Sequence, residues 1–263
     1  MKNRNFGWFL LKISLCCSAI AFGFAKLDWT PNILVSAQLI PIDRMSPLSS
    51  RIYRRCRSAT VRVVKADSAG SGVIINRNGN VYSVLTNWHV VDSSNPLILT
   101  VDNQQHQLVQ APQQIGNVDL ALLQFYSDAE YPMVEIETKM PQLGETVYVA
   151  GFPLNNESDE LGFGNESFRL TQGKVSVVPA KSLPQGYQLG YTNTTEMGMS
   201  GSPIFDAEGS LVAIHGRGKY RDPGFGVYIF EDGSEPSPPQ LKQMIQASWG
   251  IPIEVYTKLY ETP

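Results

Sequence analysis

Residues 72–86 read Gly-Val-Ile-Ile-Asn-Arg-Asn-Gly-Asn-Val-Tyr-Ser-Val-Leu-Thr, and this stretch has the pattern of a β-hairpin. Asn78-Gly79 supplies the positive φ that a tight turn needs, so we expect antiparallel strands at Gly72–Asn76 and Val81–Thr86. Outward from the hairpin, apolar residues mostly alternate along the chain, which is typical of strands. Further strands are predicted at Ala59–Lys65, Leu97–Val101, Gln107–Gln110, Leu120–Phe125, Thr146–Ala150, Phe168–Val178, Tyr187–Tyr191, Pro203–Phe205, Leu211–His215 and Gly226–Ile229.

These short strands, with Gly, Pro and Asn turns between them, predict an all-β fold. About a dozen strands are too many for one small barrel. Pro141 and Gly144 interrupt the pattern near its middle. We therefore expect two antiparallel β-barrels, over residues 52–140 and 141–236, with a cleft between them.

The end of the chain departs from this alternation. Leu241, Met244, Ile245 and Trp249 recur at helical spacing, which predicts a helix over 238–249. The second unit is thus expected to cover residues 141–263, as a barrel followed by a C-terminal helix.

The first 37 residues have the order of a secretory signal peptide. Lys2 and Arg4 precede an apolar stretch, Phe6 to Phe24, and small residues then lead to Ala37. We expect cleavage before Gln38, with residues 38–51 as a linker or pro-segment and a secreted or periplasmic location. The alternative is an uncleaved membrane anchor, because the apolar stretch approaches the ~17–25 residues that span a bilayer.

Removal of residues 1–37 would take away Cys16 and Cys17 and leave Cys56 as the one remaining cysteine. A single cysteine forms no internal disulfide, so the mature fold must depend on its core. We expect Cys56 to be a partly buried free thiol, with pairing to another chain as the alternative. The sequence leaves the oligomeric state undetermined.

Charge and motif content exclude several classes of protein. The formal net charge is −3, whereas a nucleic-acid-binding domain shows a basic face. The three histidines and three cysteines form no cluster with zinc-ligand spacing. Since the glycines also lack a phosphate-loop pattern, we expect neither a cofactor nor a metal.

Three segments carry residues suited to nucleophilic catalysis: Thr86-Asn87-Trp88-His89-Val90-Val91, Asn117-Val118-Asp119-Leu120 and Gly198-Met199-Ser200-Gly201-Ser202-Pro203. A serine hydroxyl needs a base to accept its proton, and an imidazole titrates near neutral pH. A buried carboxylate fixes the tautomer of that imidazole. The candidate catalytic residues are therefore His89, Asp119 and Ser200.

Together, these segments resemble the chymotrypsin-like serine peptidases, whose triad has the same order along the chain. The resemblance covers residues 52–260 and implies a secreted serine endopeptidase that cleaves polypeptides through an acyl-enzyme. It also implies that the N–H groups of Gly198 and Ser200 form the oxyanion hole.

Three further residues are candidates for substrate binding. Thr194 occupies the position where, by the same resemblance, an Asp would imply preference for Lys or Arg, so the resemblance does not imply that preference here. The Ser200 segment and Ala213-Ile214-His215-Gly216 resemble the bacterial glutamyl endopeptidases. That resemblance implies that Thr195 and His215 line a pocket for an acidic P1 side chain. Glu196 would oppose such a substrate if it faced the pocket.

Alternatives remain open. Asp92 is a rival partner for the histidine, and His215 could be a structural histidine. The segment 70–75 and the pattern around His89 also resemble the envelope quality-control proteases, which carry a peptide-binding domain after the protease. With about 28 residues left after residue 235, too few for an ordinary domain, we expect a stand-alone protease. A non-catalytic peptide-binding protein on a protease fold is the alternative from another class.

Overall fold

The structure is a computed structural model that describes residues 38–39, 47–66, 68–92, 95–154, 168–219, 222, 224 and 226–260. The predicted signal peptide, residues 1–37, lies outside the described residues. Among the helices of the described ranges, none is long and apolar enough to cross a membrane.

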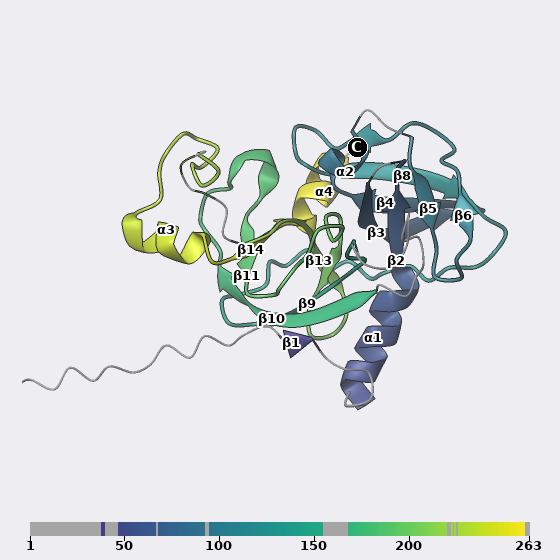
Figure 1. Ribbon diagram of the computed structural model, residues 1–263, viewed down its shortest axis with the longest axis horizontal. Helices are drawn as coiled ribbons and strands as arrows, with labels where there is room; N and C mark the ends of the chain where they lie inside the picture. The colour runs from purple at the N-terminus through teal and green to yellow at the C-terminus, as the bar shows by residue number, and fades with distance from the viewer. Residues whose placement is uncertain are drawn as a thin grey trace, which may run out of the picture. The chain divides into compact units, whose positions relative to one another are not determined.

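The second half of the chain forms a closed barrel of six antiparallel strands, which confirms that part of the predicted fold (Figure 1). The ring closes because β9 pairs with β12 on one side and with β10 on the other. A two-residue strand, β1 (Gln38–Leu39), pairs with β10 from outside the ring. In ring order the strands are β9 (Thr146–Gly151), β10 (Arg169–Val177), β11 (Leu189–Tyr191), β14 (Ser248–Pro252), β13 (Leu211–Arg217) and β12 (Pro203–Phe205).

The first half forms an open sheet, so the predicted closed barrel over 52–140 is corrected. The strand order is β6 (Gln105–His106), β5 (Leu97–Leu99), β2 (Thr60–Val64), β3 (Ala69–Asn78), β4 (Val81–Thr86), β8 (Ala121–Tyr126) and β7 (Gln113–Gln114). Between the β6 side and β8, the described residues make a single bridge, from Leu108 to Phe125. Residues 103–114 are rich in Gln and lack the apolar alternation that supports a long strand, so they pair only briefly.

The predicted hairpin is present as β3 and β4. Gly79 has φ +60°, the left-handed conformation that a glycine adopts without steric cost. The register shifts between Ile74 and Asn76, which marks a β-bulge in the ladder. The hairpin aligns β4 so that its end, Thr86, leads directly into the segment with His89.

An unpredicted helix, α1 (Pro47–Ala59), precedes β2 and begins inside the segment assigned to a linker or pro-segment. Ile52, Cys56 and Ala59 lie on its buried face at helical spacing. Three arginines lie between these positions, at 54, 55 and 57, and they hide the apolar spacing in the sequence. Cys56 is fully buried, deeper than predicted, and burial raises the pKa of its thiol.

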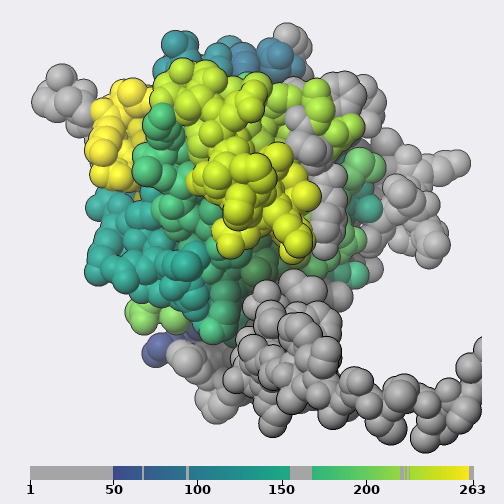
Figure 2. All heavy atoms as spheres, turned by 90° about the vertical axis from the view of Figure 1, so that its left-hand side faces the viewer, coloured from purple at the N-terminus to yellow at the C-terminus, as the bar shows by residue number. Residues whose placement is uncertain are grey.

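The C-terminal region differs from its prediction. The helix α3 (Pro238–Met244) ends before Trp249, which lies in β14 and pairs with Gly190 and Arg217. A second helix, α4 (Ile253–Tyr260), follows β14. Figure 2 shows the residues around α3, in yellow-green, at the centre of the face that looks left in Figure 1. The predicted strand Gly226–Ile229 is also wrong, because residues 226–228 form a turn.

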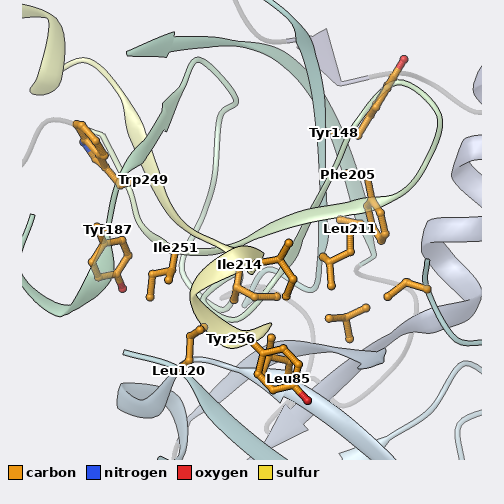
Figure 3. Packing of buried hydrophobic residues seen from close by; sticks show 14 of the residues in the cluster. Leu85, Leu120, Tyr148, Tyr187, Phe205, Leu211, Ile214, Trp249, Ile251 and Tyr256 are labelled. Atoms are coloured by element: carbon orange, nitrogen blue, oxygen red, sulfur yellow. The ribbon is translucent and has the colours of Figure 1, made fainter. Parts of the chain in front are cut away.

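One hydrophobic core includes residues of both sheets and of α4. Leu85 of β4 and Leu122 of β8 belong to the same buried cluster as Ile214, Ile251 and Tyr256. Figure 3 shows Leu85, Leu120 and Tyr256 gathered below Ile214. The two halves therefore share apolar contacts, which fixes the strand ends that carry the candidate site.

Candidate active site

His89 lies on a single helical turn, α2 (Trp88–Val91), that begins directly after β4. Val90 and Val91 are buried and anchor this turn in the core. The side chain of His89 is 46% exposed, so its ring reaches the surface while its backbone is fixed.

Asp119 holds the imidazole of His89 in place. Its carboxylate is buried and precedes β8 by two residues. Oδ2 lies 2.7 Å from His89 Nδ1, and Oδ1 accepts the backbone N–H of His89 at 2.9 Å. With Nδ1 occupied by the carboxylate, Nε2 is the nitrogen left to act on a substrate or nucleophile. Among the described residues, Asp119 rather than Asp92 is thus the carboxylate that contacts this ring.

The charge state of Asp119 follows from its surroundings. Burial by itself would raise the pKa of Asp119. Hydrogen bonds from His89 and Tyr187, together with the electrostatic interaction with His89, outweigh burial and lower the pKa below its usual value. The carboxylate is therefore ionised at neutral pH and available to orient His89.

Asn87, which the sequence analysis did not single out, joins the three motif segments. Its Nδ2 donates to the Asp119 carbonyl at 2.9 Å, and its Oδ1 accepts the Gly201 N–H at 2.6 Å. The residue is fully buried. In the sequence, the available signal for Asn87 was its position two residues before a candidate histidine. Its partners, Asp119 and Gly201, are 32 and 114 residues away, so no local pattern connects them.

Ser200 lies in the segment between β11 and β12, close to α2. Its carbonyl accepts the Ser71 N–H at 2.8 Å. A Cβ built on Gly70 would lie 3.1 Å from this carbonyl oxygen and 2.5 Å from Val90 Cγ1. The Ser200 backbone and the helix of His89 therefore pack against the same spot on β3, and the structure brings all three motif segments together.

The turn that presents Ser200 depends on glycines. Gly198 and Gly201 have φ +89° and +85°, respectively. Ser71 Oγ donates to the Gly198 carbonyl at 3.0 Å and accepts the Phe152 N–H at 2.9 Å. Within the described part of the chain, the N–H groups of Gly198 and Ser200 donate to no protein acceptor. Two backbone donors are thus left for another molecule.

The candidate substrate-binding residues have different environments. Thr194 is exposed, whereas Thr195 is half-buried with Oγ1 3.4 Å from Ser248 Oγ. His215 is buried, and its Nδ1 hydrogen-bonds the hydroxyl of Tyr191. The His215 carbonyl accepts the Gly201 N–H at 2.9 Å, so its backbone lies beside the Ser200 turn. Ser248, which the sequence analysis did not identify, joins this group from β14.

Comparison with known proteins agrees with this geometry. Residues 70–214, more than half of the chain, match the family described as the trypsin-like peptidase domain. The chain belongs to this family of serine peptidases. The predicted membership of the trypsin-like enzymes is thereby confirmed, while closeness to the glutamyl endopeptidases is not.

The curated relatives bear the name probable periplasmic serine endoprotease DegP-like. The one from Marinomonas sp. (strain MWYL1) is 29% identical over 162 residues, 60% of this chain and 31% of that protein. The one from Pseudomonas putida (strain GB-1) is 25% identical over 202 residues, 73% of this chain and 39% of that protein. The chain thus spans between 31% and 39% of the length of these relatives.

A solved structure shares the fold. The crystal structure of the serine endoprotease from Yersinia pestis matches with a TM-score of 0.56 and 21% identity, over 82% of this chain and 66% of that chain. At this identity the match supports the fold alone.

Among the described residues, no group of three or more His, Cys, Asp or Glu side chains is arranged to hold a metal ion. His106, the third histidine, contacts Thr100 Oγ1 and the hydroxyl of Tyr131 at 3.3 and 3.2 Å. It therefore belongs to a separate polar cluster in the open sheet.

Proposed function

We propose that this protein is a serine endopeptidase with Ser200 as nucleophile, His89 as general base and Asp119 as the residue that orients His89. The observation that carries the proposal is the contact of the buried Asp119 carboxylate with the His89 ring, because Asn87 ties the Asp119 backbone to the Ser200 turn. An imidazole held by a carboxylate beside a Gly-x-Ser-Gly turn is the arrangement that activates a serine hydroxyl.

The reaction follows from these positions. Ser200 Oγ attacks the peptide carbonyl while its proton passes to His89 Nε2, and the imidazolium then protonates the leaving amine. The negative oxygen of the tetrahedral intermediate is received by the N–H groups of Gly198 and Ser200, and loss of one such donor typically costs ~10²–10³ in rate. His89 next activates the water that hydrolyses the acyl-enzyme.

The proposal includes a preference for acidic P1 residues. A carboxylate is bound well by charge-assisted hydrogen bonds from imidazolium and hydroxyl groups. Thr195 and Ser248 provide neighbouring hydroxyls near the Ser200 turn, and His215 provides an imidazole. The Tyr191–His215 hydrogen bond also fits the alternative, a structural histidine, so the cleavage sites decide between the two.

We propose that the protein acts outside the cytoplasm, with polypeptides as substrates. In residues 1–37, basic residues are followed by an apolar stretch and then by small residues, and this order supports export. The names of the distant relatives place them in the periplasm.

The test is digestion of denatured casein by residues 38–263, beside Ser200→Ala, with cleavage sites read by mass spectrometry. We expect wild-type cleavage after Glu or Asp and no cleavage by the variant. Cleavage after other residues would refute the acidic preference and leave the triad intact. Equal cleavage by both proteins would refute the role of Ser200. Binding of unfolded chains without cleavage by either protein would favour the non-catalytic alternative.

A further inference from the structure

We propose that Tyr187 is a positioning residue for the Asp119 carboxylate, an inference that rests on the proposed function. Tyr187 is fully buried, and its hydroxyl donates to Asp119 Oδ2. This is the oxygen that also contacts His89 Nδ1. A carboxylate oxygen fixed from two directions has little freedom to turn away from the imidazole.

The neighbouring strand leaves room for this hydroxyl. Gly216 follows His215 in β13, and a Cβ at this glycine would lie 2.1 Å from the Tyr187 oxygen. The same Cβ would lie 3.0 Å from Asn87 Nδ2. Any larger residue at 216 would therefore displace the Tyr187 hydroxyl, so Gly216 and Tyr187 form a sterically matched pair.

Arg217, the next residue of β13, contacts the face of the Tyr187 ring. Its guanidinium carbon lies 3.9 Å from the centre of the Tyr187 ring, within the range of a cation–π contact. Its Nη2 also donates to the Pro184 carbonyl and to Gln185 Oε1, at 3.2 and 3.0 Å. The ring is thus held between β13 and its own loop.

That loop also supports Asp119 through the backbone. The short helix η3 (Pro184–Gly186) directly precedes Tyr187, and the Gln185 carbonyl accepts the Asp119 N–H at 3.0 Å. Gln185 has φ +69°, which is uncommon for a residue with a side chain. Because one loop contacts both the backbone and the carboxylate of Asp119, it serves as a rigid support for the acidic member of the triad.

The ring and the hydroxyl of Tyr187 have separable roles. The ring belongs to the buried hydrophobic cluster, and Figure 3 shows it beside Ile251 with its oxygen pointing away from Trp249. Replacement by Phe keeps the apolar ring and removes only the donor to Asp119. Among the described residues, the titratable groups that interact with this carboxylate are His89 and Tyr187, and the Arg217 guanidinium lies over the Tyr187 ring.

The experiment compares Tyr187→Phe with a matched control, Tyr82→Phe. Tyr82 is equally buried, but it lies near the start of β4, at the end away from Thr86, and its hydroxyl donates to the Ala129 carbonyl. For Tyr187→Phe we expect kcat on a peptide substrate to fall roughly ten- to hundredfold at unchanged KM, the range of one hydrogen bond to a charged group. The low-field proton resonance of the His89–Asp119 hydrogen bond should also shift. Tyr82→Phe should alter neither kcat nor that resonance.

A second variant tests the steric match. Gly216→Ala should move the Tyr187 hydroxyl and lower kcat at least as much as Tyr187→Phe does. The double variant should have a kcat only slightly below that of Gly216→Ala alone. Unchanged kcat and an unchanged resonance in folded Tyr187→Phe would overturn the proposal, as would a rise in KM alone. If wild type hydrolyses no peptide, the proposed function fails, while the resonance still reports whether Tyr187 positions Asp119.

Discussion

At the scale of single residues, the buried amide of Asn87 is one of the links between the motif segments. Asn87→Ala would leave the Asp119 carbonyl without its donor, at a cost of about 1–3 kcal/mol in the free energy of unfolding. Activity should fall as well, because the Asp119 backbone is released. Urea denaturation and peptide hydrolysis measure the two effects.

Asn80→Ala is the matched control, because Asn80 Nδ2 donates to Asp128 Oδ1 in an exposed setting. A loss for Asn87→Ala no greater than for this control would contradict the proposed role of the buried amide.

The lowered pKa of Asp119 predicts how stability depends on pH. When a carboxyl group has a lower pKa in the folded state than in the unfolded state, its contribution to stability is fully present at pH values above the unfolded-state pKa. This contribution is lost as the pH falls through the folded-state pKa. The difference in unfolding free energy between wild type and Asp119→Asn should thus be largest near neutral pH and shrink below about pH 4. Urea unfolding over a pH series measures it, and a difference that grows on acidification would refute the prediction.

At the scale of elements, the turn around Ser200 depends on Gly201 more strictly than the hairpin turn depends on Gly79. Both have positive φ, which costs roughly 1–2 kcal/mol with a side chain. A Cβ at Gly201 would also lie 2.0 Å from the Ser71 carbonyl oxygen, whereas nothing lies within 4 Å of one at Gly79. Gly201→Ala should abolish activity, and Gly79→Ala should cost only that conformational energy. Parallel activity and melting measurements compare them, and retained activity in Gly201→Ala would refute the expectation.

The elements also show what local pattern can and cannot reveal. The hairpin was predictable because its alternation and its Asn-Gly turn are local signals. Trp249 fits helical spacing after Leu241 and Ile245, yet pairing with β11 and β13 places it in a strand. Among the candidate site residues, His89 and Asp119 lie in recognisable motifs. Tyr187 has no local signal, because its partner Asp119 is 68 residues away.

At the scale of the whole described fold, the shared core predicts that the two sheets unfold together. Tyr256 of α4 lies in the cluster that contains Leu85 and Ile214. Tyr256→Ala should lower the free energy of unfolding by about 3–5 kcal/mol, the usual cost of truncating a buried aromatic residue. Near- and far-ultraviolet circular dichroism should still report one transition. Separate transitions in the variant or the wild type would show that the halves are independent.

The sequence predicted a barrel for both units alike, so it did not distinguish the closed barrel of the second half from the open sheet of the first. Closure depends on the pairing of β9 with both β10 and β12. These pairings join strands that are distant in the sequence, so no local pattern reveals them. Openness depends on the short pairing of polar segments at β6 and β7, where apolar periodicity is weakest.

Because Cys56 is buried, the reactivity of its thiol reports how often the folded structure opens. If residues 1–37 are removed, as the sequence predicts, Cys56 is the sole cysteine, and it lies on the face of α1 that packs into the core. Since thiolate is the reactive form and the raised pKa suppresses it, an alkylating reagent should modify the native protein very slowly. The rate of alkylation then measures how often the structure opens, and in an oxidising compartment this same enclosure keeps the lone thiol from linking one copy to another.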